Sequence, residues 1–477
     1  MASPSTAKIL EVSHVAPFTA SPESPTHFIL PLTFFDILWF KVSPVERVFF
    51  YSLPETKDSF LSSVLPKLKH TLSLTLQYFL PLAGKLTWPQ DSQKPVVLYT
   101  PGDVVSVSVA ESNAEFDLLA SNHAFQASMV RPLVSPLHVT ETGASVIALQ
   151  ITVFPHYGFS IGLTTHHAVL DGKSMTMFMK SWAYLSKENP PLLPELTPFY
   201  DRTAIIEPYG FDTIRFLNNW LGNPGLTPSD CRNNPKLFEF IQFQSQDEPS
   251  HLYRATFELG RSDIDKLRQL VSSNWDKTHI SPKPKLHLSS FVLTFAYVFD
   301  CILKATEGDE SKKKVFLGFT ADYRNRLTPP VSDNYFGSCV GFKMTYDNMR
   351  GHFFGSEEDS LTAVAVKISG LVNELGNQND VLKEAEYLLS NMGSIVSEKS
   401  HGVGVAGSPR FGVYNIDFGW GRPKKVSVIS IENGSISMAE SRDGDGGVEV
   451  GLVLKKQQMD LFASAFATGL SNILSIV

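Results

Sequence analysis

The chain has few cysteines, few charges and no long apolar run. The three cysteines are Cys231, Cys301 and Cys339. They are too few and too scattered for a disulfide framework or a zinc signature, and this scarcity favours a reducing compartment. No run approaches the ~18 apolar residues of a membrane-spanning helix. Residues 1–18 also lack the basic and apolar regions of a signal peptide. We therefore expect a soluble, cytoplasmic protein without membrane contact.

An excess of positive charge is absent as well. The chain has 41 lysines and arginines against 48 aspartates and glutamates, a net charge of -7. This balance argues against nucleic acid as a partner, because nucleic-acid binders carry a basic face. A hydrophobic content of 43% and a charged content of 19% are typical of a globular protein, and 477 residues predict two domains.

A proline-rich stretch over residues 189–198 marks the expected division. Proline cannot continue a helix or a central strand, and the chain over residues 201–249 is polar and irregular. We therefore expect an N-terminal domain over residues 1–205, a boundary region over residues 206–250 and a C-terminal domain over residues 251–477.

Hydrophobic periodicity predicts a mixture of strands and helices. Apolar residues alternate in strands and recur at three- and four-residue spacing in helices, and Asn-Gly between two strands is typical of a hairpin. The predicted strands are 147–153 (half-buried), 159–163, 253–259, 426–431, 436–438 (joined to the preceding one at Asn433 and Gly434) and 448–454. The predicted helices are 61–79 (capped by Asp58, kinked or ended at Pro66), 172–187, 262–271, 287–301 and 459–470.

The most informative segment is residues 164–172, Thr-Thr-His-His-Ala-Val-Leu-Asp-Gly, at a predicted strand-to-helix junction. It places His167 and Asp171 four residues apart. Histidine accepts and returns a proton near neutral pH, and an acid one turn later can fix the ring or its loop. Three interpretations are open: a metal ligand, for which no further ligands lie nearby, a buried core histidine, or a general base.

Two other patterns are weaker. Residues 158–162 match the Gly-x-Ser-x-Gly nucleophile elbow, but Ser160 lies inside an apparent strand and not on a turn that opens a helix. Residues 402–407 match Gly-x-Gly-x-x-Gly, but no clear strand pattern precedes them and no helix pattern follows. We therefore expect a sheet position for Ser160, and a flexible loop in place of a dinucleotide site at residues 402–407.

A second motif lies near the end of the chain. Residues 417–421, Asp-Phe-Gly-Trp-Gly, place two glycines around a tryptophan, which predicts a tight loop with a buried aromatic anchor. A structural role is favoured for Asp417, which would hold this loop at some distance from any substrate.

The two motifs together resemble the plant BAHD acyltransferase family. The resemblance extends to residues 78–86, 321–326 and 334–339 and covers essentially the whole chain. Residues 31–36 and 166–174 are most similar to the branch of phenolic glucoside malonyltransferases. The resemblance implies an α/β fold of two similar chloramphenicol acetyltransferase-like domains, with mixed sheets flanked by helices. A long crossover would join these domains, and a channel would run between them.

The resemblance also implies the chemistry. His167, at the centre of the channel, would remove the proton of a sugar hydroxyl, expected to be the 6-hydroxyl of a phenolic or flavonoid glucoside. The alkoxide would attack malonyl-CoA directly. Trp420 or backbone amides near Gly172 are candidate donors to the resulting oxyanion. Malonyl-CoA is then a co-substrate, no cofactor or metal is bound, and a monomer is expected.

The other motif residues receive supporting roles from the resemblance. Asp171 and Asp417 complete the catalytic motifs without moving protons, and Asp171 is expected to pair with an arginine. Residues 335–337 resemble the branch that acylates flavonoid and anthocyanin glycosides, and Ser338 stands where that branch usually has asparagine. The residues expected to give structural support are Arg324, Arg326, Gly419 and Gly421.

Two anionic groups of the donor need cations. The nucleotide end of CoA needs cations and helix N-termini. The candidates are Lys283, Lys285, Ser289 and Ser290. A solvated basic loop explains the two lysines equally well. The malonyl carboxylate needs a cation near the acyl pocket; the candidates are Lys173, Arg47 and Arg202.

Three other functions stay open. A hydroxycinnamoyl-CoA-dependent transferase would act on similar glycosides through an apolar acyl pocket. A non-catalytic small-molecule binding protein would keep the fold without the reaction. A serine hydrolase would use Ser160 as its nucleophile.

Overall fold

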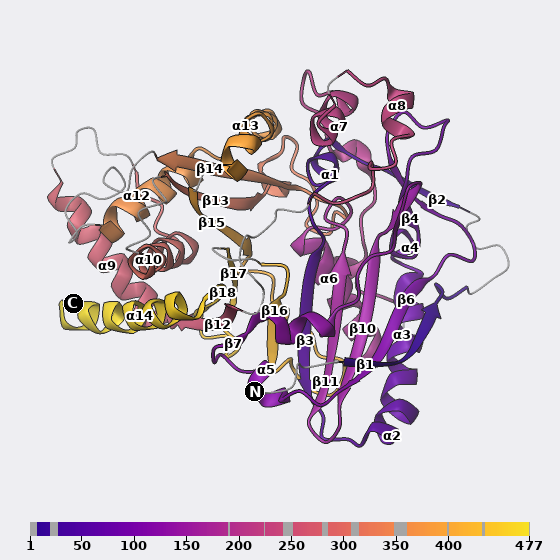
Figure 1. The fold of residues 1–477 in the computed structure, drawn as a ribbon, viewed down its shortest axis with the longest axis horizontal. Helices are drawn as coiled ribbons and strands as arrows, with labels where there is room; N and C mark the ends of the chain where they lie inside the picture. The colour runs from indigo at the N-terminus through magenta and orange to yellow at the C-terminus, as the bar shows by residue number, and fades with distance from the viewer. Residues whose placement is uncertain are drawn as a thin grey trace.

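The structure is a computed structural model. It describes residues 7–19, 27–188, 191–223, 225–241, 251–278, 285–306, 314–347, 360–397, 400–431 and 435–476. Lys283, Asn433 and Gly434 lie outside these residues. Figure 1 shows an N-terminal half in indigo to magenta beside a C-terminal half in orange to yellow.

A six-stranded sheet forms the centre of the N-terminal half. Its order is β1-β6-β10-β11-β3-β16, and all neighbours are antiparallel except β6 and β10. The strands are β1 (Ala7–Val15), β6 (Val105–Ser112), β10 (Ile147–Phe154), β11 (Gly158–Thr165), β3 (Val45–Ser52) and β16 (Lys425–Val428).

Two further sheets complete the fold. The seven-stranded sheet of the C-terminal half contains, in order, β14 (Val340–Asp347), β13 (Lys314–Asp322), β15 (Ser400–Gly407), β17 (Ile436–Glu440), β18 (Val448–Lys455), β12 (Leu252–Leu259) and β7 (Phe125–Gln126). A five-stranded sheet contains, in order, β2 (Phe28–Pro31), β5 (Val96–Tyr99), β4 (Lys85–Thr87), β9 (Gly143–Ser145) and β8 (Val139–Thr140).

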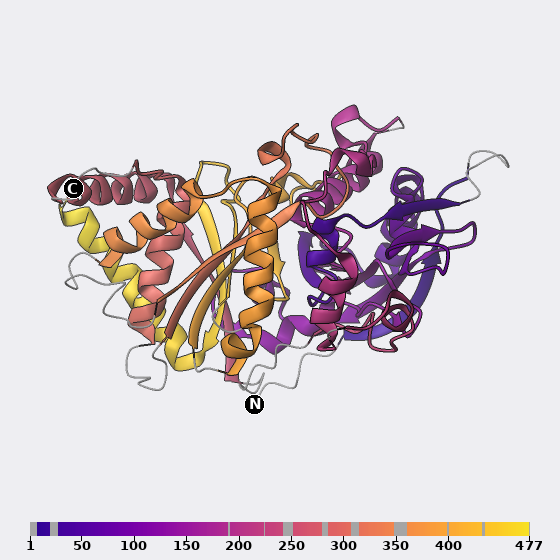
Figure 2. The ribbon, with the colours of Figure 1, turned by 90° about the horizontal axis from the view of Figure 1, so that it is seen from above.

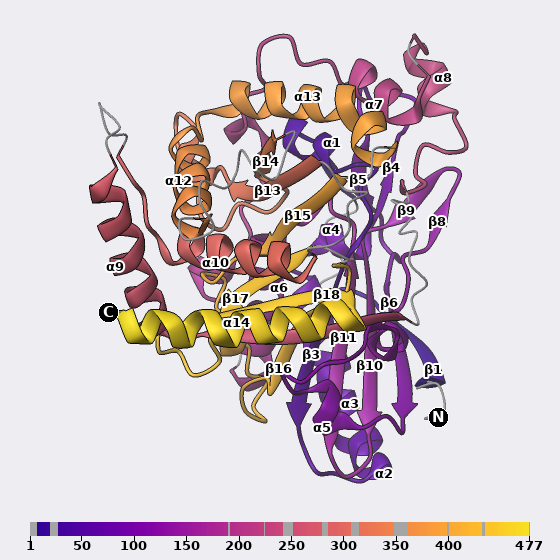
Figure 3. The ribbon, with the colours of Figure 1, turned by 60° about the vertical axis from the view of Figure 1, so that its left-hand side comes forward.

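Helices flank these mixed sheets, which confirms the predicted α/β class. Helices α9, α10, α12 and α14 lie together on the C-terminal half (Figure 3), and the view from above shows the two halves side by side (Figure 2). The helices are α1 (Phe34–Leu38), α2 (Lys57–Ser59), α3 (Leu65–Leu76), α4 (Leu80–Ala83), α5 (Phe116–Leu119), α6 (Gly172–Lys187), α7 (Thr213–Leu221), α8 (Pro228–Arg232), α9 (Arg261–Lys277), α10 (Ser290–Ala305), α12 (Ser360–Asn373), α13 (Gln378–Ser397) and α14 (Lys456–Ile476).

The two halves exchange short strands. β7 of the N-terminal half pairs with β12, and β16 of the C-terminal half pairs with β3. The predicted hairpin between residues 426–431 and 436–438 is therefore wrong, because β17 pairs instead with β15 and β18 in the other sheet. Val428 and Ile429 are buried in separate clusters, so tertiary burial overrides the local turn signal.

The predicted loop at residues 402–407 is also wrong. These residues belong to β15, which pairs in parallel with β13 and β17. Val403 and Val405 are buried in the core of the C-terminal half, and this burial stabilises a strand where the glycine pattern indicates a loop.

The predicted helix of residues 61–79 starts and ends earlier. Oγ1 of Thr56 accepts a hydrogen bond from the Ser59 amide at 3.2 Å, so Thr56 is the N-cap and Asp58 is not. A π-helical turn, Phe60–Val64, precedes α3, and Pro66 lies in the first turn of α3. Because the π-helical turn runs directly into α3, Pro66 lies inside a continuous helix, and the irregular turn before it accommodates the missing amide donor.

Other predicted elements agree with the structure, but β10 is buried on both faces and not on one. Gln150 makes this burial possible because its polar atoms are paired. Its Nε2 donates to the Pro132 carbonyl at 2.7 Å, and its Oε1 accepts from Ser135 at 3.0 Å. Pairing of this kind removes the penalty for burying an amide.

The N-terminal core contains segments from both halves. Tyr323, Phe336, Tyr414 and Phe418 of the C-terminal half pack into the same cluster as β11 and α6. These contacts bring residues 323–340 and 411–418 to the loop that joins β11 to α6.

Candidate active site

The His-x-x-x-Asp motif occupies the predicted strand-to-helix junction. β11 ends at Thr165 and α6 begins at Gly172. Asp171 is the N-cap of α6, because its Oδ1 accepts from the Ser174 amide at 2.8 Å. A short aspartate cap of this type fixes the start of a helix, and it therefore fixes the end of the loop that carries His167.

The two adjacent histidines have different environments. His166 is fully buried, and its Nδ1 accepts from the Ala168 amide at 3.3 Å. Burial lowers the pKa of His166 to about 3, so His166 is a neutral core histidine. His167 is partly exposed, and its ring stacks on Trp39 with centroids 4.0 Å apart and planes at 7°. Trp39 is itself held by a 3.0 Å hydrogen bond from Nε1 to the Val340 carbonyl.

His167 is neutral near pH 7. Burial lowers its pKa to about 4, while its own backbone carbonyl and Asp171 oppose the shift. A neutral imidazole has one nitrogen with a free lone pair and can accept a proton. Nδ1 of His167 is buried and has no hydrogen-bond partner among the described residues, so the partly exposed ring can meet a substrate through Nε2.

Asp171 forms a buried ion pair with Arg324 and not with Arg326. Oδ2 of Asp171 accepts from Nη1 of Arg324 at 2.7 Å, and both side chains are fully buried. Arg326 is directed instead to the Leu375 carbonyl at 3.4 Å. Burial alone raises the pKa of Asp171, but Arg324 and the amides of Ser174 and Cys339 outweigh it and hold the pKa below its usual range.

Residues of the C-terminal half hold the motif loop from the other side. Arg324 also donates to the carbonyls of Tyr335 and Gly337 at 3.1 and 3.2 Å. Oγ of Ser338 donates to the His167 carbonyl at 2.7 Å, and the Cys339 amide donates to Asp171 at 3.1 Å. No motif predicts the roles of Ser338 and Trp39, and Ser338 is noted in the sequence only as a departure from the branch pattern.

The loop of residues 417–421 lies away from His167. Oδ1 of Asp417 accepts from the amides of Gly419 and Gly421 at 2.7 and 2.9 Å. Both glycines have φ near +100°, a conformation that favours glycine. Phe418 is buried between aromatic rings of β3 and α6.

Trp420 is not brought to the histidine. Its ring contacts Phe159, near the start of β11, with centroids 6.0 Å apart, whereas His167 follows the end of that strand. The amide hydrogen bonds of Asp417 and the position of Trp420 agree with a structural loop. The geometry therefore does not support Trp420 as a donor to the oxyanion or as a substrate contact.

A groove of about 790 Å³ lies beside β14 in the C-terminal half. Lys285 lines it with Lys343 and Lys367, but Lys343 is paired with Glu374 and Glu384. Lys285 and Lys367 are exposed, with no ion pair among the described residues. Ser289 and Ser290 do not line the groove: Ser289 caps α10 by accepting from the Val292 amide at 3.3 Å, and Ser290 begins that helix.

Strand β14 connects this groove to the histidine. Lys343 on β14 lines the groove, and the neighbouring Phe342 packs on Trp39 with centroids 4.3 Å apart. Trp39 in turn stacks on His167. Because successive side chains of a strand point to opposite faces, Lys343 and Phe342 lie on different faces of β14, and neither Trp39 nor His167 lines the groove.

The three candidate cations for an acyl carboxylate differ in availability. Lys173 pairs with Asp322 and Asp333 at 3.4 and 2.5 Å. Arg202 donates from Nη1 to Tyr335 and to the Phe336 carbonyl, while its Nε and Nη2 are buried without a partner among the described residues. Nε and Nη1 of Arg47 are buried and have no hydrogen-bond partner in the described part of the chain.

Ser160 lies within β11, as predicted. Its residue is fully buried, and it pairs in register with Phe50 of β3 and Thr152 of β10. A serine in the middle of a central strand has no access to a substrate. Among the described residues, no cluster of three His, Cys, Asp or Glu side chains could hold a metal ion, and no helix has the length and hydropathy needed to cross a bilayer.

Known proteins resemble this chain over nearly its whole length. Residues 10–468 match the Transferase family. A phenolic glucoside malonyltransferase of Arabidopsis thaliana is 43% identical over 98% of both chains. A malonyl-CoA:anthocyanidin 5-O-glucoside-6''-O-malonyltransferase of the same plant is 39% identical over 98% of this chain and 99% of its own.

A solved structure gives the same result for the fold. Vinorine synthase superposes with a TM-score of 0.65 at 18% identity, over 96% of each chain. The predicted acyltransferase fold is thereby confirmed. The chain belongs to the Transferase family, the family of the BAHD acyltransferases.

Proposed function

We propose that this protein transfers a malonyl group from malonyl-CoA to a sugar hydroxyl, the 6-hydroxyl, of a phenolic or flavonoid glucoside, with His167 as general base. The observation that carries the mechanism is the state of His167, which is neutral, partly exposed and fixed against Trp39. The donor and the acceptor class rest on the malonyltransferases that are 39–43% identical to this chain.

The first step is removal of the hydroxyl proton. Nε2 of His167 takes the proton while the sugar oxygen attacks the thioester carbonyl carbon of malonyl-CoA. General-base assistance contributes ~10²–10⁴-fold to the rate. Stacking on Trp39 and the hydrogen bond from Ser338 support this step, because both limit the positions that the ring can adopt.

The second step is collapse of the tetrahedral intermediate. The carbon–sulfur bond breaks, and His167 returns its proton to the CoA thiolate. The oxyanion needs preorganised donors worth ~3–4 kcal/mol each. Backbone amides at the start of α6, near Gly172, are the proposed donors, since Trp420 lies near the far end of β11.

The CoA moiety is proposed to bind in the groove beside β14. Its phosphates would meet Lys285 and Lys367, which have exposed side chains and line that groove. Lys283 stays a candidate from the sequence and lies outside the described residues. Ser289 and Ser290 stay in this proposal only because they form the start of α10, and the N-terminus of a helix favours an anion.

Three broader parts of the proposal concern the protein as a whole. We propose a cytoplasmic enzyme, supported by three free and buried cysteines, and a monomer. We also propose the domain division at residues 206–250, supported by the core cluster of the C-terminal half, which consists of residues after this region; the other large cluster takes residues from both halves.

The pH dependence of kcat/KM is expected to follow the depressed pKa of His167. Because the free enzyme holds His167 neutral above a pKa of about 4, kcat/KM should be constant from pH 8 down to about pH 5 and fall only below it. An unperturbed histidine would instead give a fall near pH 6.5. A pH series with short assays and stability controls would measure this limb, and a midpoint near 6.5 would contradict the buried, neutral ring.

Donor and acceptor panels test the function itself. The purified protein should transfer malonyl from malonyl-CoA to a flavonoid 7-glucoside and a naphthol glucoside, with a mass increase on the sugar seen by mass spectrometry. Coumaroyl-CoA should be a poor donor. A clear preference for coumaroyl-CoA would make the protein a hydroxycinnamoyl transferase, and the absence of transfer from every donor would favour a binding protein.

Ser160→Ala separates the hydrolase alternative. The variant should keep its transferase activity, because Ser160 lies inside the sheet. Loss of activity in this variant, together with acyl-CoA hydrolysis in the absence of an acceptor, would support a serine nucleophile instead.

A further inference from the structure

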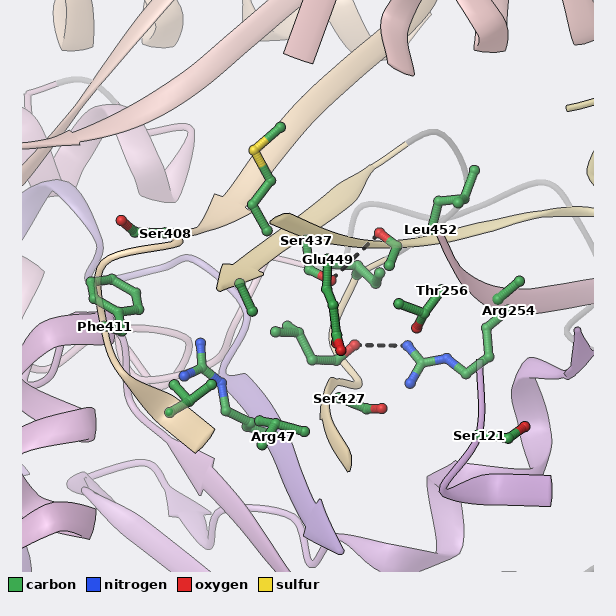
Figure 4. Close-up of a pocket in the computed structure, with 18 of the residues that line it drawn as sticks. Arg47, Ser121, Arg254, Thr256, Ser408, Phe411, Ser427, Ser437, Glu449 and Leu452 are labelled. Atoms are coloured by element: carbon green, nitrogen blue, oxygen red, sulfur yellow. Dashed lines mark hydrogen bonds between the residues drawn. The ribbon is translucent and has the colours of Figure 1, made fainter. Parts of the chain in front are cut away.

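A small cavity lies between the two halves, beside the exchanged strand β16. Its volume is about 40 Å³, which is room for about three water molecules. Figure 4 shows the guanidinium of Arg47 on the side of Phe411 and Arg254 entering from the other side. The cavity is thus lined by arginines from both halves of the chain.

Arg47 is the less engaged of these two arginines. Its residue is 5% exposed, and neither Nε nor Nη1 has a hydrogen-bond partner among the described residues. Arg254 is 6% exposed and donates from Nη2 to the Val428 carbonyl at 2.7 Å. A buried guanidinium without a bound anion is unfavourable, so Arg47 is positioned for an anion from outside the chain.

The acids around the cavity form no ion pair with Arg47 in the described part of the chain, although the charge of Glu440 opposes the lowering of the Arg47 pKa. Glu449 is paired with Lys425 at 2.9 Å. Glu440 accepts from the Tyr414 amide at 3.1 Å and faces both Lys180 and Arg47, without an ion pair to Arg47 in the described part of the chain. Burial lowers the pKa of Arg47 only to about 10, so it is charged near neutral pH.

The cavity adjoins the motif loop. Arg47 on β3 is paired in register with Leu163 on β11, four residues before His167. Phe411 lines the cavity, and a Cβ placed on Gly172 would lie 2.7 Å from the Phe411 ring. One aromatic ring therefore separates the cavity from the first residue of α6.

We propose that Arg47 binds the free carboxylate of the acyl donor and thereby selects a malonyl group over neutral acyl groups. This inference rests on the proposed function and names the residue that gives it donor specificity. Lys173 pairs with Asp333, and Arg202 bonds to Tyr335 and the Phe336 carbonyl through Nη1, although its Nε and Nη2 are buried without partners. The Arg47 side chain has no hydrogen bond or ion pair in the described part of the chain. A carboxylate has three heavy atoms and fits the cavity, while the phenol ring of a coumaroyl group needs more room.

The first experiment compares donors in the parent protein and in Arg47→Met. With malonyl-CoA, kcat/KM should fall about 100-fold, because a charged hydrogen-bond pair is lost. With acetyl-CoA, kcat/KM should change less than threefold. Arg47→Lys should give an intermediate loss with malonyl-CoA, because it keeps the charge without the planar guanidinium. The matched control is Arg215→Met, whose exposed side chain forms a surface pair, and it should leave both donors unchanged.

Equal losses with both donors in a folded Arg47→Met variant would overturn the proposal. A donor switch in Arg254→Met with none in Arg47→Met would also overturn it, since Arg254 would then bind the carboxylate. If the variants do not fold, the parent protein supplies the test. It should prefer malonyl-CoA over the neutral methyl ester of malonyl-CoA about 100-fold. Equal use of both donors would reject the proposal that a cation binds the free carboxylate. A parent that transfers no malonyl at all would refute the proposed function itself.

Discussion

Replacing His167 by alanine is expected to lower kcat by about 10³-fold, the central value for loss of a general base. Within this loop, His167 is the only described side chain that stacks on Trp39. Its ring is partly exposed and neutral. Binding of the acyl donor should be retained, because the proposed CoA groove beside β14 is built from other residues. Steady-state kinetics and calorimetric titration with CoA would measure the two effects separately.

His138→Ala is the matched control for this prediction. His138 is an exposed histidine of the same half, and among the described residues only its backbone carbonyl is bonded, by accepting from the Ser145 amide. The control should keep full activity, and both variants should retain the parent's thermal unfolding midpoint within a few degrees. Transfer by His167→Ala within threefold of the parent would show that His167 is not the base.

Asp171→Asn is expected to lower the free energy of unfolding by about 3–5 kcal/mol, because it leaves the buried Arg324 without its main counter-charge. Asp322 lies 3.0 Å from Arg324 but is partly exposed, so it compensates only in part. The Asp171 pKa is depressed. Its contribution is therefore complete above the unfolded pKa of about 4 and is lost as pH falls through the folded value.

Asp333→Asn is the matched control for Asp171→Asn. Asp333 also pairs with a cation, Lys173, but its side chain is 73% exposed, and surface pairs contribute ~0–1 kcal/mol. Denaturant titrations of the two variants at pH 7 would give the difference. Equal midpoints for both would mean that the buried pair does not hold the motif loop. In that case the coupling between Asp171 and Arg324 would have no structural consequence.

The local part of the fold could be predicted from the sequence. Strand β11, helix α6 and the junction between them follow from alternation and from three- and four-residue spacing, and Asp171 begins α6 as an N-cap aspartate should. The position of Ser160 inside a strand follows from the same alternation. Such features depend on residues within one or two turns of each other, so local pattern is sufficient.

Strand pairing could not be predicted in the same way. The Asn-Gly signal predicted a hairpin between the segments on either side of it, but β16 pairs with β3 of the N-terminal half. The glycine-rich residues 402–407 predicted a loop, but buried valines make them a strand of the C-terminal sheet. In both cases burial against distant parts of the chain outweighs the local preference.

The family, the histidine motif and the helix that follows it can be predicted from the order of the amino acids alone. The folded structure is needed to show which histidine is partly exposed, which arginine pairs with Asp171, and how the candidate cations are bonded. These features depend on contacts between distant residues: the Trp39 side chain and the Val340 carbonyl are 301 positions apart, and Arg324 and Asp171 are 153 apart. Burial, pairing and the pKa of His167 are properties of these contacts and therefore arise only in the folded chain.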